Sequence, residues 1–219
     1  MSNREFQFDE LSHTYRVGGV IVPGVTRVID HAGLTDYDNV RADILDRRSA
    51  LGRVVHRCIH FWNQNDLDWA TVDERAKGYV ESAIMLADDL KLQPRQVECQ
   101  CVAELNGMLY GMQVDWEGFV GPDEALIDYK ITRQAQPHHA IQLAGYALGL
   151  PHEKLTSSWA RFLARKRFIA KLHEQGKRAR LIPYESKNDA KVYESALVTT
   201  HWKLLMGKKI EPIELEEAA

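Results

Sequence analysis

The 219-residue chain has little of what marks several common protein classes. It has three cysteines, an odd number without paired spacing, which argues against a disulfide framework and indicates a reducing compartment. No apolar run approaches the roughly 20 residues that span a bilayer, and the first residues lack the apolar core of a signal peptide. These absences predict a cytoplasmic protein with no membrane partner.

The charge balance does not indicate a nucleic-acid-binding protein either. Lysine and arginine total 28 against 31 acidic residues, so the formal net charge is −3. A basic surface, if the fold forms one, must therefore be local. An apolar fraction of 45% is ordinary for a globular core. No repeat or linker divides the chain, so residues 1–219 are expected to form a single domain.

Hydrophobic periodicity and turn signals predict an α/β fold with a central mixed β-sheet flanked by helices. Residues 1–35 are expected to form an N-terminal β-meander with a short helix, and residues 36–150 the core. Residues 151–206 are expected to form a second, basic β-hairpin followed by a C-terminal helix. Residues 207–219 are expected to be a tail. The expected helices are Thr26–His31, Tyr37–Asn63, one from a Thr71–Glu74 capping box to Leu90, Pro137–Leu148 and Asn188–Met206. The expected strands are Val97–Leu105 and Leu109–Val120 around the Asn106-Gly107 turn, Ala125–Ile131, Ser158–Leu172 and Arg178–Tyr184.

Two carboxylates and a lysine end neighbouring apolar strands. Asp115 follows Val114, and Asp128 follows the pair Leu126-Ile127. The period of two along a strand places Lys130 on the same side as Asp128. Two acids held close together repel unless a cation lies between them, and Mg²⁺ takes one or two carboxylates. The pattern indicates metal-assisted phosphodiester hydrolysis, with the lysine near the attacking water.

A glycine and two histidines stand out on the long helix. Gly52 inside a helix costs about 1 kcal/mol relative to alanine, so it is expected to mark a close backbone approach. His56 follows one turn later, and His60 one turn after that. No third soft ligand follows at a familiar spacing, which argues against a zinc site. A histidine at the edge of the core is the alternative interpretation of His56.

Two further groups are candidates for contact with nucleic acid. Gln142 and Tyr146 are four residues apart on one helix and share a face, where they either contact DNA phosphate or order the lysine. Basic residues crowd the region from 161 to 180, opposed by Glu174 alone. A solvated hairpin and a DNA-backbone track explain this crowding equally well. The DNA-binding candidates in this region are Arg161, Arg165, Lys166, Arg167, Lys177 and Arg178.

Together these motifs resemble the PD-(D/E)XK nuclease superfamily, specifically its RecB-type and phage exonuclease branch. That branch carries, in order, a helical Gly-x-x-x-His, a strand glutamate, Gly-x-x-Asp, Asp-x-Lys and Gln-x-x-x-Tyr. The matching residues here are Gly52/His56, Asp115, Asp128-Tyr129-Lys130 and Gln142/Tyr146. Glycine lies four residues before Asp115, one more than is usual. Glu98 fits the strand glutamate better than Glu104, and both remain candidates.

The resemblance implies a restriction-endonuclease-like core with catalytic residues Glu98, Asp115, Asp128 and Lys130. Mg²⁺, for which Mn²⁺ can substitute, would be held by His56, Asp115, Asp128 and the backbone carbonyl of Tyr129. An iron–sulfur cluster is not expected, because its four cysteines are missing. The implied partners are DNA and, as candidates, a single-strand annealing or recombination protein and a second copy of the chain, in a bacterial or phage-infected cytoplasm.

Three functions remain open at this stage. The first is a phage or prophage exonuclease that acts in recombination or DNA processing. The second is an endonuclease on the same core. The third is a catalytically silent DNA-binding or assembly module.

Overall fold

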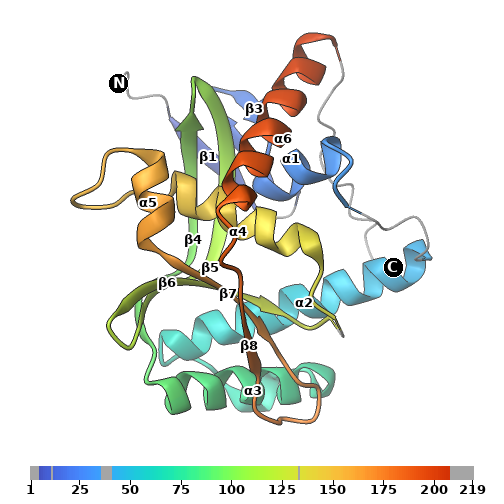
Figure 1. The fold of residues 1–219 in the computed structure, drawn as a ribbon. Helices are drawn as coiled ribbons and strands as arrows, with labels where there is room; N and C mark the ends of the chain where they lie inside the picture. Colours follow the sequence, from blue (N-terminus) through green and yellow to red (C-terminus); the bar gives the residue numbers. More distant parts are fainter. Residues whose placement is uncertain (1–4, 11, 36–40, 133, 208–219) are drawn as a thin grey trace.

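The computed structural model describes residues 5–10, 12–35, 41–132 and 134–207. It is an α/β protein in which a five-stranded mixed sheet lies between two layers of helices, with a separate three-stranded antiparallel sheet at the N-terminus (Figure 1). This architecture confirms the expected fold class. Among the described helices, none combines the length and apolar character needed to cross a membrane.

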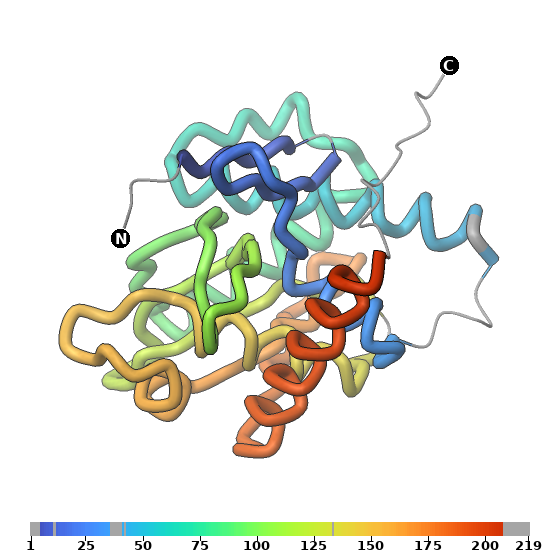
Figure 2. Tube along the Cα trace, turned by 90° about the horizontal axis from the view of Figure 1, so that it is seen from above, coloured from blue at the N-terminus to red at the C-terminus, as the bar shows by residue number. Residues whose placement is uncertain are grey.

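The N-terminal sheet consists of β1 (Phe6–Asp9), β2 (Thr14–Val17) and β3 (Val20–Val22), followed by α1 (Val25–His31). A parallel β-bridge between Gly24, which directly precedes α1, and Gly111 of the main sheet joins the two sheets. Tyr15, which is 1% exposed, lies against Gly111. The two sheets are therefore packed together at the glycine that precedes Asp115, and Figure 2 shows the N-terminal sheet (blue) beside the hairpin of the main sheet (green).

Helices α2 (Ala42–Asn63) and α3 (Glu74–Leu90) cover one face of the main sheet, with the short 3-10 helix η1 (Trp69–Thr71) between them. Residues 36–40, where the long helix was expected to begin, lie outside the described residues. The capping-box prediction was wrong in its residue. Asp73, not Thr71, caps α3, because its side chain accepts a hydrogen bond from the Arg75 amide at 2.9 Å.

The main sheet has the order β4-β5-β6-β7-β8. Its strands are β4 (Gln93–Leu105), β5 (Met108–Val120), β6 (Asp123–Lys130), β7 (Lys166–Lys171) and β8 (Arg180–Pro183). The β6–β7 pair is parallel and the other three pairs are antiparallel. The turn between β4 and β5 is the expected one, since Asn106 and Gly107 both have positive φ, at 53° and 79°.

The other face of the sheet is covered by α4 (Pro137–Gly149) and α6 (Asn188–Leu205), with α5 (Ser158–Ala164) beside α4. The expectation of a strand from Ser158 was wrong. Ser157 caps a helix through Ala160, and only Lys166–Lys171 are extended. The parallel crossover from β6 to β7 thus contains two helices, as parallel pairing requires, and α4 supplies nine buried residues to the layer.

Candidate metal centre

Strands β5 and β6 separate at the site. Their pairing ends at Trp116–Ile127, and the next residue of β5 is Asp115. The carboxylate of Asp115 takes the place of a ladder partner, because its Oδ2 accepts a hydrogen bond from the Tyr129 amide at 2.8 Å. Asp115 is only 6% exposed. The fork between the strands therefore holds one carboxylate oxygen in place and leaves the other, Oδ1, directed at neighbouring elements.

His56 reaches this fork from α2. Its Nε2 lies 2.9 Å from the Tyr129 carbonyl oxygen. A carbonyl can only accept, so Nε2 carries the proton. Its Nδ1 lies 3.3 Å from Asp115 Oδ1 and 3.5 Å from Glu98 Oε1. The backbone of Tyr129 thus orients both the imidazole and the Asp115 carboxylate, and it presents Nδ1 to the two acids.

Glu98 comes from β4, between the pairs Val97–Trp116 and Cys99–Val114. Its φ is 50°, the left-handed region that side-chain-bearing residues rarely adopt within a strand. The ligand atoms of His56, Glu98 and Asp115 all lie within 4.8 Å of one another. The strained backbone at Glu98 turns its carboxylate into this cluster, and such strain concentrates at functional sites.

Asp128 and Lys130 form a second part of the site. Asp128 is 1% exposed, and its Oδ2 lies 2.6 Å from Lys130 Nζ. Its Oδ1 is buried and has no hydrogen-bond partner among the described residues. Burial raises the pKa of Asp128 to about 6, and the charge of Asp115 adds to the shift while Lys130 opposes it. Lys130 offsets part of the cost of burying this carboxylate, but Oδ1 is left without a partner in the described part of the chain, which is costly in the protein interior.

The charges in the cluster stabilise one another. Burial opposes the charged imidazolium, but the charge of Asp115 and hydrogen bonds to Asp115 and Glu98 outweigh it and raise the pKa of His56 well above its ordinary value. Burial likewise opposes ionisation of Asp115, yet His56, Lys130 and the Tyr129 amide hold the pKa of Asp115 below its usual range. Without a metal, His56 therefore acts as the cation of the cluster.

The donor set fits a divalent cation. One imidazole nitrogen and the carboxylates of Glu98 and Asp115 converge from three elements. The Asp128 carboxylate of β6 lies near enough for the charges of Asp115 and His56 to shift its pKa. Carboxylate oxygens are the ligands that Mg²⁺ and Mn²⁺ prefer. The Oδ1 atom of Asp128 supports the same conclusion, because it has no hydrogen-bond partner among the described residues and a metal ion would be a positively charged partner for it. The residues that could hold a metal are thus His56, Glu98 and Asp115, with Asp128 beside them.

Gln142 and Tyr146 do share a face of α4. The Gln142 side-chain amide donates to the Tyr146 hydroxyl at 2.8 Å, and both residues are buried. Burial raises the pKa of Tyr146 well above its ordinary value, and the charges of Asp128 and Asp115 add to the shift. The pair therefore lies under the acids, where it can order the site more readily than it can contact a DNA strand.

The basic candidates are divided by the structure. Arg165 has a fully buried side chain that lies 3.3 Å from Glu117, and Arg167 lies 2.9 Å from Asp189. Both arginines are interior ion pairs, so the expectation that they bind DNA is corrected here: spacing along the chain did not reveal that their side chains point into the protein.

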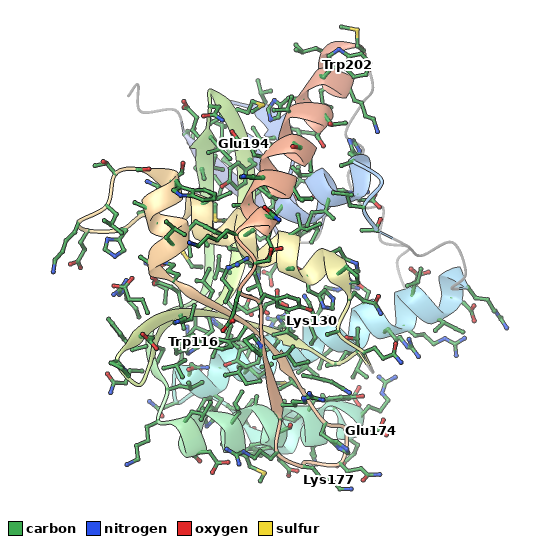
Figure 3. The ribbon with its side chains drawn as sticks, viewed as in Figure 1. Trp116, Lys130, Glu174, Lys177, Glu194 and Trp202 are labelled. Atoms are coloured by element: carbon green, nitrogen blue, oxygen red, sulfur yellow. The ribbon has the colours of Figure 1, made fainter. Side chains whose placement is uncertain are left out.

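The remaining candidates lie nearer to solvent. Arg161 donates to the Leu148 carbonyl at 2.8 Å and 3.2 Å. Arg178 pairs with Asp89 of α3 at 2.9 Å. Lys166 and Lys177 are exposed. Figure 3 shows Lys177 at the far end of the β7–β8 hairpin, away from Lys130. Arg161 and Arg178 are thus engaged by groups of the protein itself, and Lys177 lies away from the candidate site.

Two glycines of the site motifs behave differently. A Cβ on Gly111 would lie 2.1 Å from the Tyr15 ring, so the glycine makes room for the N-terminal sheet. A Cβ on Gly52 would meet only Ile131 Cδ1, at an ordinary 3.9 Å. Among the described residues no close backbone approach occurs at Gly52, whereas one occurs at Gly111. No signal in the sequence pairs Gly111 with Tyr15.

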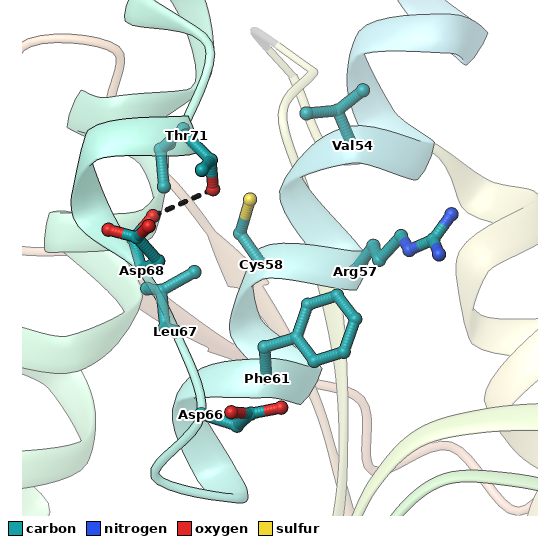
Figure 4. A pocket seen from close by; sticks show the side chains of 9 residues that line it. Val54, Arg57, Cys58, Phe61, Asp66, Leu67, Asp68 and Thr71 are labelled. Carbon is teal, nitrogen blue, oxygen red and sulfur yellow. Dashed lines mark hydrogen bonds between the residues drawn. The ribbon is translucent and has the colours of Figure 1, made fainter.

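A hollow of about 320 Å³ lies elsewhere, between the second half of α2 and η1 (Figure 4). Its lining residues include Val54, Cys58, Phe61 and Leu67, with Arg57 over the Phe61 ring at 5.6 Å. None of the metal-cluster residues lines it. The hollow is therefore separate from the candidate metal centre.

Comparisons with known proteins support the fold. No family model matches the chain, and no curated protein matches it. The solved structure of a "Putative exonuclease" from Eubacterium rectale is similar over 84% of this chain and 80% of its own, with 13% identity and a TM-score of 0.53. A crystal structure of SSO0001 is similar over 75% of this chain and 77% of its own, with 12% identity and a TM-score of 0.36. At these identities the first likeness shows a shared fold.

Proposed function

We propose that this protein is a metal-dependent deoxyribonuclease of the PD-(D/E)XK type. The observation that carries the proposal is the convergence of His56, Glu98 and Asp115 within 4.8 Å, together with the contact between the buried Asp128 and the half-buried Lys130. A nuclease function agrees with the fold shared with the exonuclease-named structure. Convergence of an imidazole, three acids and a lysine is what hydrolysis of a phosphodiester needs.

The residues have distinct roles in this proposal. His56, Glu98, Asp115 and Asp128 hold a divalent metal, Mg²⁺ with Mn²⁺ as a substitute. The bound metal supplies Lewis-acid stabilisation of the phosphate charge and a more acidic water. The Tyr129 carbonyl was expected to bind the metal directly, and we propose a different role for it. It accepts a hydrogen bond from His56 Nε2 and so fixes the orientation of the imidazole, as hydrogen-bond acceptors that contact metal-binding histidines often do.

Lys130 is proposed to act on the attacking water or on the phosphate. Its ammonium lies 2.6 Å from Asp128 Oδ2, and its side chain is 20% exposed. An ammonium at this position stabilises negative charge that develops on the phosphate and orients the attacking water. Gln142 and Tyr146 support the acids from below.

The finer assignment is a phage or prophage exonuclease that leaves 5′-phosphates and works in recombination or DNA processing. It rests on the order of the sequence motifs. A single-strand annealing or recombination protein, and a second copy of the chain, are candidate partners in the cytoplasm of the host cell.

The test is a cleavage assay on two substrates. End-labelled linear duplex and closed circular DNA are incubated with the protein in Mg²⁺, in Mn²⁺ or in EDTA, beside the variant Asp128→Asn. We expect metal-dependent loss of linear DNA alone, abolished in the variant. Cleavage of the circle would instead identify an endonuclease. Intact DNA under every condition would contradict the proposal and favour a silent binding module.

A further inference from the structure

Three basic residues form a row across the main sheet, starting at the lysine of the candidate site. Lys130 is the last residue of β6 and pairs with Lys171, the last residue of β7. Lys171 pairs in turn with Arg180, the first residue of β8. Residues paired across strands project from the same face of a sheet. The three cations therefore point to one side, in order, from the candidate metal centre towards the sheet edge.

The register assigns this row to the face that carries the site acid. Asp128 and Lys130 are two residues apart on β6, so they share a face, and their side chains are in contact at 2.6 Å. Asp128 pairs with Ile169, and Ile169 with Ile182, and both isoleucines pack against the core beside α4. The cationic row follows where this apolar packing ends.

The outer members of the row differ from three arginines of the same region that lie in ion pairs. Arg165, Arg167 and Arg178 each lie in an ion pair with an acid. Lys171 and Arg180 have no side-chain hydrogen bond or ion pair within the described part of the chain, and they are half-buried and exposed respectively. Their charges are thus available to a ligand.

Protection of a sheet edge explains only part of the row. Charged residues on an edge strand discourage pairing with other chains, and Arg180 lies on β8, the edge strand. Lys171, however, lies on β7, which is paired on both sides. A lysine at that position has no edge to protect, so the row needs a second reason.

The dimensions suit a nucleic-acid backbone. Neighbouring strands are about 4.8 Å apart, so three strands place the cations along roughly 10 Å. A DNA strand carries one phosphate per about 3.4 Å of helix rise. Measured as rise along the helix axis, this length corresponds to about three nucleotides, so the row that begins at Lys130 is long enough to meet successive phosphates.

We propose that the row Lys130–Lys171–Arg180 holds the DNA strand next to the scissile phosphate, with Lys171 and Arg180 binding successive backbone phosphates. The inference rests on the proposed nuclease function for the identity of the ligand. It narrows the DNA track from all the basic residues between positions 161 and 180 to Lys171 and Arg180, which the sheet register aligns with the site.

The experiment measures binding of a fluorescent duplex oligonucleotide in Ca²⁺ or EDTA, where cleavage is not required, over a range of salt concentrations. The variants are Lys171→Gln, Arg180→Gln and the double variant. Lys177→Gln is the matched control, because it removes an exposed cation from the same hairpin at its far end. Circular dichroism verifies that each variant is folded.

Removing one phosphate-binding cation lowers the slope of log K against log salt by about 0.9. We expect a slope reduced by about 1.8 and a Kd raised about tenfold or more in the double variant, with Lys177→Gln close to wild type. Equal effects of all variants, or none, would overturn the row. The two proposals fail separately. Wild-type cleavage with unchanged binding in the double variant rejects the row alone, whereas row-dependent binding without metal-dependent cleavage rejects the nuclease alone.

Discussion

The Nδ1 atom of His56 lies 3.3 Å from Oδ1 of Asp115, where helix α2 meets the fork between β5 and β6. Because Nε2 of the same ring donates to the Tyr129 carbonyl, the imidazole has one orientation. In that orientation Nδ1 can either carry a proton or bind a metal ion, but not both. Protonated, it bridges the carboxylates of Asp115 and Glu98, and deprotonated, it is free to bind a metal.

This relationship predicts proton release on metal binding. The pKa of His56 is raised well above its ordinary value, so the ring is protonated at pH 7 without metal. If Nδ1 binds the metal, about one proton leaves at pH 7. Calorimetry with Mn²⁺ in buffers of different ionisation enthalpy measures that number. Release close to zero, with His56→Gln binding metal normally, would show that His56 is a counter-ion and not a ligand.

Substitutions of Glu98 and Glu104 can show which of the two glutamates belongs to the site. Glu98 lies in the cluster, whereas Glu104 is exposed near the β4–β5 turn. We expect Glu98→Gln to lower metal affinity or cleavage rate about 10- to 100-fold, and Glu104→Gln to leave both unchanged. Metal titrations and initial cleavage rates for the two variants decide the matter. Equal activity of both variants would remove Glu98 from the site.

Asp128 is expected to trade stability for function. Its folded-state pKa of about 6 exceeds the ordinary 3.8, so the folded state binds the proton more tightly than the unfolded state. The sign follows: in metal-free protein this group's contribution to stability falls as the pH rises from about 4 to about 6. Asp128→Asn should abolish cleavage and gain on the order of 2–3 kcal/mol over the wild type above pH 6. Urea unfolding in EDTA at pH 4 and pH 7 tests this, and a variant less stable than wild type at pH 7 would contradict it.

Two glycine-to-alanine substitutions should change the free energy of unfolding in opposite directions. Gly111→Ala forces a methyl into the Tyr15 ring and is expected to cost about 1–3 kcal/mol. Gly52→Ala lies in a helix with open space and should gain about 0.5–1 kcal/mol. Thermal unfolding of both variants compares them directly. A stable Gly111→Ala protein would mean that the N-terminal sheet is not held at this point.

Arg165 is expected to matter for stability and not for DNA. Its removal leaves the buried Glu117 carboxylate with Arg95 as its remaining ion-pair partner, at 2.9 Å. Arg165→Ala should therefore cost about 3 kcal/mol of unfolding free energy. The salt slope of DNA binding should stay at the wild-type value. A folded variant with normal stability and weakened binding would restore Arg165 to the DNA track.

Asp128 and Lys130 could be predicted as neighbours from the sequence because their spacing along one strand is local. His56 and Glu98 lie on other elements, and their place in the site was expected only from the family resemblance. Apolar residues before Asp115 and Asp128 predict strands, and the period of two places Lys130 beside Asp128, as the 2.6 Å contact confirms. Asn106-Gly107 likewise needs only its own backbone preference to form a turn. Periodicity and turn chemistry act over a few residues, so they determined the element order and the α/β class.

The tertiary structure alone decided what the long-range contacts do. Whether an arginine points into the protein or outward depends on the elements around it, so Arg165 was indistinguishable from Lys177 in the sequence. Of the two glycines in the site motifs, Gly111 and not Gly52 is closely packed, because the constraint comes from Tyr15 on another sheet. The row from Lys130 through Lys171 to Arg180 exists only through strand register. Register and packing depend on burial of whole faces, a property of the assembled fold that no short stretch of sequence contains.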